Sequence, residues 1–243
     1  MTIMNRMGFD PKKVQQQLQH LGLVPEGVET PSPDFDLVLR QFVSQQTLIS
    51  ESELSPDQIS RSLTTPLCGT PPRLELASAL AVGEPASANE EHLTYSVLNW
   101  WNGSTLERDM QKSIVKEAFK HWKNESGSRF EDAGEGNPQA DIRISWERGD
   151  HGDGRSFTPG GDSIHLIAHA FYPLAAGAAA PGSPEAIYAR SIHLNQDVLW
   201  YGNSSGNHPN LLSVLIHEIG HTLGHEHDPD RCAIMNAHFG LLC

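Results

Sequence analysis

The sequence predicts an α+β fold, in which a twisted mixed sheet, a long helix and a helix near the carboxyl end follow a small three-helix unit. Three observations support this class. Helical periodicity dominates about the first seventy residues, a connection rich in Pro, Ala, Gly and Ser follows, and β-rich segments then alternate with helical ones. We therefore divide the chain into residues 1–75, 76–91 and 92–243.

Three short segments of the first unit carry apolar residues at helical spacing. They are residues 11–21, 35–46 and 56–63. The third begins with Ser55 and Pro56, a capping residue followed by a proline suited to the first helical position. These segments predict the small three-helix unit.

The second unit opens with a β-rich segment, residues 93–101, and continues with STLE at residues 104–107, a capping box that predicts the start of a long helix. One face of this helix is apolar, so we expect it to pack on a sheet. That face comprises Leu106, Met110, Ile114, Val115, Ala118, Phe119 and Trp122.

The rest of the second unit contains further strand patterns and one more helix. Strands are expected at residues 140–146, 164–171 and 189–194, a loop at 173–186, and a helix at 211–224. The buried side of that helix is formed by Leu212, Leu215, Ile216, Ile219 and Leu223.

The charge balance restricts the classes of partner. Seventeen basic residues against thirty acidic ones give a net charge of -13, which argues against nucleic acid or an anionic membrane surface as the partner. No apolar run reaches the length of a membrane span, and residues 1–13 lack the apolar core of a secretory signal. We therefore expect a globular protein that binds neither nucleic acid nor an anionic membrane surface.

The stretch HEIGHTLGHEHD, residues 217–228, contains the candidate metal ligands and the candidate catalytic residue. His217 and His221 are four residues apart, so their rings project from one face of a helix and suit a single metal ion. Gly224 can adopt the left-handed conformation that ends the helix, and the turn brings His227 back as a third ligand. His225 and Glu226 are not spaced to join this set, and we expect them to face solvent.

Three neutral imidazoles on zinc leave a fourth position for water, which is typical of a catalytic rather than a structural site. Glu218 follows the first ligand and can reach that water as a general base. Zinc lowers the pKa of the water toward about 7 and polarises a carbonyl. Glu218 would then take the proton and pass it to a leaving amine.

The extended spacing HExxHxxGxxH, followed by CAIMNAHFG, resembles the zinc motif and Met-turn of the metzincin peptidases, and within them the matrixins. The resemblance implies that Met235 forms a hydrophobic floor beneath the zinc. It also implies that Phe239 stands where matrixins have a tyrosine lining the specificity pocket. Asp228, after the last ligand, is more typical of the adamalysin branch.

Three further segments, GDHGDG, IAHAF and SIHLN, resemble those that hold a second, structural zinc in matrixins. Carried over by motif, the ligands are His151, Asp153, His169 and His193. Three histidines and one carboxylate make a closed tetrahedral set. His165 is a competing candidate, because the interval between the first and second segments is longer than in the family.

The segments that bind calcium in matrixins are only partly matched in this sequence. The loop FDGPGGN of the family appears here as FTPGGDS, and only Asp141, Asp162 and Asp197 remain as candidate ligands. A hard cation needs several oxygens, with carboxylates among them. The sequence predicts weak or absent calcium binding.

The segment TTPLCGTPPR resembles the cysteine switch of matrixin zymogens, which implies that the Cys68 thiolate ligates the catalytic zinc in a latent form. Leu67 and Pro72 stand where the family has arginine and aspartate, so we expect a looser latent state. No dibasic site occurs in residues 70–91, and activation by self-cleavage or another protease is expected there. Among three cysteines, Cys232 and Cys243 are close enough to pair.

Taken as implied by the resemblance, the chain is a zinc metalloendopeptidase of metzincin fold, made as a latent zymogen with a propeptide at residues 1–75 and a catalytic domain at 92–243. It would bind two zinc ions and cleave extended protein substrates laid along residues 164–171, outside the cell. Few residues follow Met235, so an incomplete specificity pocket is expected. Two alternatives stay open: an inactive zinc-bound binding protein, and a metzincin of another branch.

Overall fold

The structure is a computed structural model of the whole chain. It describes residues 12, 14, 15, 18, 33–47, 52–70, 92–103, 105–157, 165–174, 182, 184–202, 209–228, 230 and 232–239.

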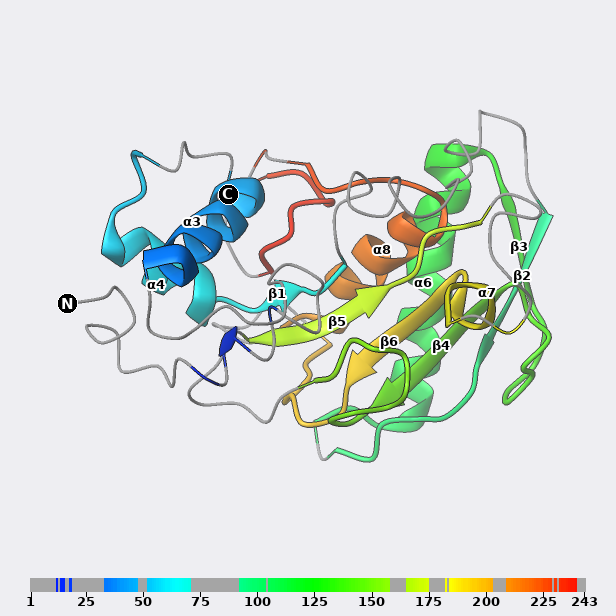
Figure 1. Ribbon diagram of the computed structural model, residues 1–243. Helices are drawn as coiled ribbons and strands as arrows, with labels where there is room; N and C mark the ends of the chain where they lie inside the picture. Colours follow the sequence, from blue (N-terminus) through cyan, green and yellow to red (C-terminus); the bar gives the residue numbers. More distant parts are fainter. Residues whose placement is uncertain are drawn as a thin grey trace.

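A mixed sheet forms the centre of the molecule (Figure 1). Its strands are β1 (Leu67–Cys68), β2 (His92–Val97), β3 (Arg129–Asp132), β4 (Ile142–Glu147), β5 (Leu166–Ala170) and β6 (Ser191–Asn195). Their order is β1-β5-β6-β4-β2-β3, and only β5 and β6 pair in the antiparallel sense. The predicted α+β class and the three strand segments from residue 140 onward are therefore confirmed.

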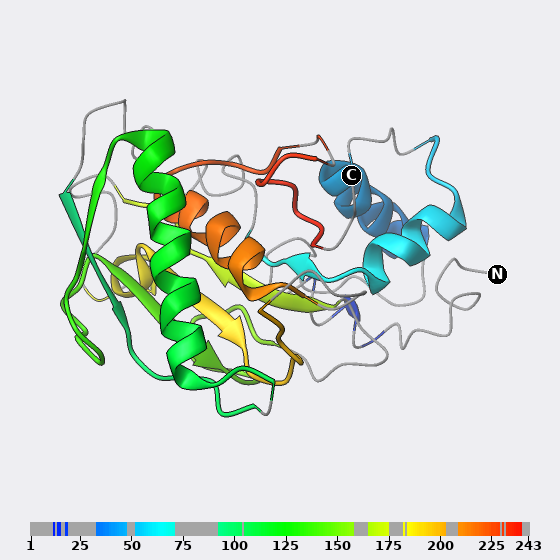
Figure 2. The same cartoon turned by 180° about the vertical axis from the view of Figure 1, so that it is seen from behind.

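Two helices, α6 (Arg108–Ser126) and α8 (Leu211–Thr222), cover the same face of the sheet (Figure 2). The ring of Tyr95 on β2 stacks on Phe119 of α6 with centroids 3.9 Å apart. The indole nitrogen of Trp122 on α6 donates a 2.6 Å hydrogen bond to the carbonyl of Ile216 on α8. The long helix thus fixes α8 against the sheet.

The start of α6 differs from the prediction. The helix begins at Arg108 and its N-cap, Glu107, makes no side-chain capping bond, while Ser104 lies outside the described residues. The buried side chain of Gln111 holds the segment before the helix instead. Its amide group hydrogen-bonds the backbone N–H and carbonyl of Trp101 and the carbonyl of Leu106. This side chain therefore satisfies backbone groups of the segment that leads into the helix.

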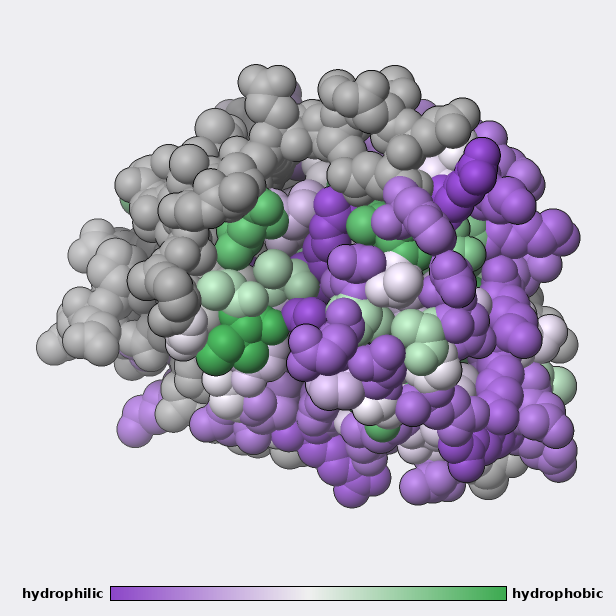
Figure 3. All heavy atoms as spheres, turned by 90° about the vertical axis from the view of Figure 1, so that its right-hand side faces the viewer, coloured by the Kyte–Doolittle hydropathy of each residue, from purple (hydrophilic) through white to green (hydrophobic). Residues whose placement is uncertain are grey.

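The predicted apolar face of α6 is also wrong at one position. Met110 is 50% exposed, whereas the other six residues named for that face are buried. Because the helix packs over the sheet only from its second turn onward, its first turn is open to solvent. Figure 3 shows that the end of the molecule nearest β2 and β3 is mainly hydrophilic, in line with the net charge.

The amino-terminal unit contains α3 (Pro33–Thr47) and α4 (Pro56–Thr64), as the sequence predicts. Ser55 caps α4 reciprocally: its hydroxyl accepts from the Gln58 amide at 3.3 Å, and its own amide donates to the Gln58 side chain at 2.8 Å. Of the first predicted helix, residues 12, 14, 15 and 18 are helical, and its other residues lie outside the described set.

Three elements were not predicted. Strand β3 has the sequence RFED, exposed at the edge of the sheet, so it lacks an apolar pattern. Helix α7 (Pro184–Tyr188) begins inside the segment expected to be a loop and is only five residues long. Strand β1 has two residues and exists only because distant segments pair with it. None of the described helices is long and apolar enough to cross a membrane.

Candidate active site

Helix α8 positions the HEIGH segment because both of its ends are fixed. The side chain of Asn210 accepts from the amides of Leu212 and Ser213, which caps the start. At the other end Gly224 has φ +97°, a left-handed conformation in which a side chain would be strained. The predicted turn at Gly224 is confirmed, and it brings His227 back toward the helix.

Three imidazoles meet above α8. Nε2 of His221 lies 3.0 Å from Nε2 of His217 and 3.1 Å from Nε2 of His227. On the far side of two rings, Nδ1 faces a backbone carbonyl: His217 faces Ile234 at 2.9 Å and His221 faces His225 at 2.7 Å. Since Nδ1 carries the hydrogen in each case, the Nε2 lone pairs converge on one point.

The electrostatics of this cluster suit a divalent cation. Burial lowers the pKa of His217 to about 4 and holds the pKa values of His221 and His227 well below the usual value for histidine. The three rings are therefore neutral near pH 7, as ligands must be. Neutral acceptors so close together repel one another unless a cation lies between them, so the donor set fits zinc.

Cys68 reaches this cluster from the amino-terminal unit. Its sulfur lies 3.6 Å from Nε2 of His221, and the four ligand atoms lie within 4.8 Å of one another. Thr70 donates its amide to the same sulfur at 3.3 Å. Burial, followed by the charge of Glu218, raises the pKa of the Cys68 thiol well above its ordinary value. Hydrogen bonds from Thr70 lower the same pKa in part, and a cation at this point would favour the thiolate further.

Glu218 lies beside the cluster, fully buried. No described residue hydrogen-bonds to either carboxylate oxygen of Glu218. Burial raises the pKa of Glu218 to about 8, although the nearby Cys68, Thr70 and Arg155 act to lower it. A buried, unpartnered carboxylate is costly in a fold and is typical of a reacting group.

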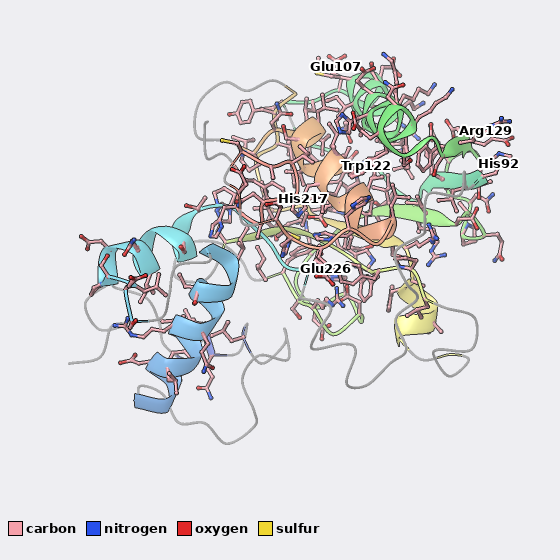
Figure 4. All side chains as sticks on the ribbon, turned by 90° about the horizontal axis from the view of Figure 1, so that it is seen from above. His92, Glu107, Trp122, Arg129, His217 and Glu226 are labelled. Carbon is pink, nitrogen blue, oxygen red and sulfur yellow. The ribbon has the colours of Figure 1, made fainter. Side chains whose placement is uncertain are left out.

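Met235 and Phe239 line the cluster from the carboxyl-terminal side. Gly220 allows Met235 to approach α8, since a Cβ on Gly220 would lie 2.5 Å from the Met235 sulfur and 2.7 Å from the Trp122 ring. The ring of Phe239 meets His217 edge-on at 4.9 Å. In Figure 4, His217 lies near Trp122 in the interior, while Glu107 and Arg129 lie at the rim.

The remaining motif residues also have defined places. His225 and Glu226 are exposed, as expected. Asp228 is exposed too, and its amide donates to the Met235 carbonyl at 2.9 Å. Cys232 is disulfide-bonded, but its expected partner lies outside the described residues, so that pairing stays a prediction.

A second cluster joins the three other motif segments. One carboxylate oxygen of Asp153 lies 2.9 Å from Nε2 of His151, 2.7 Å from Nε2 of His169 and 2.7 Å from Nδ1 of His193. The ring nitrogens of His169 and His193 are 3.1 Å apart. His165 is not part of this cluster, whose four ligand atoms lie within 4.8 Å of one another.

The second cluster also fits zinc. Although burial alone would raise it, the pKa of Asp153 is held far below its usual range by hydrogen bonds from His151, His169 and His193. Burial lowers the pKa of His169 to about 3, so that ring is neutral at pH 7. Three imidazoles and a carboxylate, all but one fully buried, form a closed set with no place for substrate.

Strand β1 lies along the edge of β5, in the place where the substrate was expected. The amide of Leu67 donates to His165 at 2.9 Å, and that of Gly69 donates to Ala168 at 2.8 Å. On its other side the Cys68 amide donates to the Ala237 carbonyl at 2.9 Å. The cysteine therefore approaches the histidines from a segment held on both sides.

Two of the three candidate calcium ligands are engaged elsewhere. One carboxylate oxygen of Asp141 accepts from the amide and hydroxyl of Thr94, at 2.8 and 2.7 Å. Asp197 pairs with Arg148 at 3.3 Å. Asp162 lies outside the described residues.

Sequence reasoning missed two residues that shape the site. Thr70 bonds both backbone groups of Ala170 through its hydroxyl, at 2.9 and 3.3 Å, which extends the pairing of β1. Gly220 offers no side chain to a metal. Its position in the middle of an apolar helix is the one local sign that another residue packs closely against it. Neither role follows from local sequence.

Comparison with known proteins gives one consistent result. The family model described as matrixin matches residues 87–242. Karilysin of Tannerella forsythia is 36% identical over 151 residues, which is 62% of this chain and 29% of karilysin. The interstitial collagenase of Sus scrofa is 38% identical over 171 residues, 70% of this chain and 31% of the collagenase. That of Bos taurus is 31% identical over 225 residues, 92% of this chain and 40% of the collagenase.

The chain spans 29% to 40% of the length of these three relatives. The comparisons confirm the predicted family resemblance and the predicted fold class. Over the segment that holds both clusters, the chain belongs to the matrixin family.

Proposed function

We propose that this chain is a zinc-dependent metalloendopeptidase held latent by Cys68. The observation that carries the proposal is the position of the Cys68 sulfur, 3.6 Å from Nε2 of His221 and grouped with His217 and His227. His217, His221 and His227 would hold the catalytic zinc, and Cys68 would fill its remaining position. A thiolate there excludes the water that hydrolysis requires.

The zinc, when bound, supplies a Lewis acid that polarises a carbonyl and lowers the pKa of a water. Glu218 accepts the proton from the attacking water and donates it to the leaving nitrogen. Its position supports this role, because the carboxylate is buried beside the three histidines and no described residue hydrogen-bonds to either of its oxygens. Backbone carbonyls hold Nδ1 of His217 and His221, so the ligands keep their orientation.

The second cluster serves a structural role in this proposal. His151, Asp153, His169 and His193 would hold a zinc that ties the loop after β4 to β5 and β6. The carboxyl-terminal floor of the catalytic cluster is Met235, which contacts α8 without offering a ligand in this set.

The substrate is a protein or peptide chain in extended conformation. We infer that it takes the place of β1, between β5 and residues 237–239, where backbone groups on both sides are available for pairing once β1 leaves. Substrate side chains near Phe239 would meet its ring, which lies against His217. The expected pocket at this end contains Phe239 in place of the tyrosine common in the family.

The amino-terminal unit is, in this proposal, a propeptide at residues 1–75, followed by an activation segment at 76–91 and a catalytic domain at 92–243. Leu67 stands where the family has an arginine and is only 1% exposed, so it contributes burial rather than an ion pair. Without that ion pair we expect a looser latent state. Action outside the cell is part of the same proposal.

A quenched-fluorescent peptide assay tests the function. The zinc-loaded full chain is assayed before and after treatment with a mercurial or limited protease, with a chelator and Glu218→Gln as controls. Activity that rises on treatment and disappears in both controls supports the proposal. Absence of activity in every state contradicts it and favours an inactive zinc-bound protein.

A further inference from the structure

The turn between α7 and β6 surrounds one guanidinium group with oxygen atoms. One terminal nitrogen of Arg143 on β4 lies 2.8 Å from the Ile187 carbonyl, 2.8 Å from the Ala189 carbonyl and 3.0 Å from the Ser191 hydroxyl. Its other terminal nitrogen donates to the Ala140 carbonyl at 3.3 Å. Three oxygens gathered on one atom, with a fourth nearby, form a cation-binding cradle.

The same turn carries backbone strain that needs such support. Arg190 has φ +57°, and among the described residues it is the one non-glycine in this region. Its own carbonyl accepts from the Arg143 amide at 3.3 Å. Arg143 therefore bonds the residues on both sides of Arg190 as well as Arg190 itself, and holds a conformation that would otherwise relax.

The oxygens of this cradle, carbonyls and a hydroxyl, are of the kind that calcium accepts, and the charge of the Asp141 carboxylate acts on Arg143. A carboxylate aimed into the cradle is missing, because position 191 is a serine and Asp141 accepts from Thr94. The guanidinium fills the centre of the cradle. The described residues at this turn therefore do not fit calcium.

The turn also bears on the second metal cluster. Tyr188, the last residue of α7, meets the ring of His193 edge-on at 5.4 Å and stacks on Phe171 at 5.4 Å. His193 follows Ser191 by two positions on β6. The contacts that stabilise this turn therefore also help to position His193, a residue of the proposed structural zinc site.

We propose that Arg143 is a built-in cation that takes the place of a structural divalent metal at the α7–β6 turn, which frees this part of the fold from calcium. The inference rests on the cradle alone and does not depend on peptidase activity.

Four zinc-loaded full-length chains test this: wild type, Arg143→Ser, Ser191→Asp, and the double variant. Thermal unfolding is followed in calcium-free buffer and in a calcium titration, with trace zinc in place of a chelator, because chelators would strip zinc. We expect Arg143→Ser to unfold several degrees below wild type and to lose its second zinc at least fivefold faster.

The double variant has an empty cradle and a new carboxylate, so we expect calcium to raise its unfolding temperature by several degrees more than it does for the wild type. Ser191→Asp alone keeps the guanidinium and should show no such gain. A wild type that gains as much from calcium as the double variant would overturn the proposal. Equal stability of Arg143→Ser and wild type would overturn it too.

Arg143→Lys separates charge from shape. A lysine keeps the positive charge but offers one compact ammonium, and should retain part of the stability without acquiring a calcium response. If Arg143→Lys behaves like Arg143→Ser in both measurements, the positive charge is not what the cradle needs, and the proposal fails.

Discussion

The sulfur of Cys68 lies 3.6 Å from Nε2 of His221, and 153 positions of sequence separate the two residues. The relationship depends on backbone hydrogen bonds around a short strand: Leu67 bonds His165 just before β5, Gly69 bonds Ala168 in β5, and Cys68 bonds Ala237. Backbone pairing on two sides therefore sets the position of one side chain, and the thiol reaches the histidines without any ion pair at Leu67.

Replacing this cysteine should activate the uncut chain. Cys68→Ser removes the soft ligand, so water can compete for the cluster, and we expect the initial rate of peptide cleavage without activation to rise about tenfold or more. The measurement is the rate with a quenched-fluorescent peptide, with a chelator control. A variant no more active than the untreated wild type would falsify the switch.

Replacing the buried carboxylate should separate chemistry from metal binding. Glu218→Gln keeps the shape but cannot accept a proton, so we expect kcat to fall by roughly 10²- to 10⁴-fold with the zinc content unchanged. Glu226→Gln, an exposed neighbour in the same motif, is the matched control and should retain activity. Loss of zinc from Glu218→Gln would point to a structural role instead.

The second cluster should bind its own zinc. His169→Ala leaves Asp153 buried with one partner fewer, so we expect one zinc less per chain and a loss of about 3–5 kcal/mol in the free energy of unfolding. Metal analysis and denaturant unfolding measure both. His165→Ala is the control, because His165 lies outside the cluster. Equal zinc content in wild type and His169→Ala would refute the assignment.

The contact between Gly220 and Met235 should be sensitive to a single methyl group. In Gly220→Ala the added carbon would approach the Met235 sulfur to 2.5 Å and the Trp122 ring to 2.7 Å. Overpacking costs about 1–3 kcal/mol and two approaches below 3.0 Å favour the upper end, whereas alanine regains up to about 1 kcal/mol of helix propensity, so we expect a net loss of about 2 kcal/mol.

Denaturant unfolding of Gly220→Ala gives this number. Gly69→Ala is the control, because a Cβ there would meet its neighbours at ordinary distances of 3.5–3.6 Å. If Gly220→Ala is as stable as the wild type, the close contact does not limit this helix.

The local parts of the fold could be predicted from sequence, and the reasons are physical. α8 has regular apolar spacing and a glycine at its end, so its bounds and the meeting of its histidines follow from helix geometry. The three histidines of the first cluster follow from motif spacing, whereas the second cluster and Cys68 follow from the resemblance to matrixins. Each depends on residue types whose chemistry is visible in the sequence itself.

The rest depends on contacts between distant segments. The two residues of β1 pair with Leu166 and Ala168, which no local pattern encodes. Arg143 lies within a predicted strand, and its contacts with residues 187 and 189 depend on the packing of the α7–β6 turn around it. The helix α6 starts later than predicted, at Arg108, and the segment before it is held by Gln111 from within the helix.

The two-sided pairing of β1 has a consequence for what happens after the chain is cut. A cut between residues 71 and 91 would break no bond that residues 66–70 make with β5 or with residues 237–239; it would remove only the tether. A tethered segment acts at an effective concentration of about millimolar, whereas a released one acts at its actual concentration. Opening of the site would then depend on dilution: the same cleaved protein would stay shut in a confined space and open in a large volume.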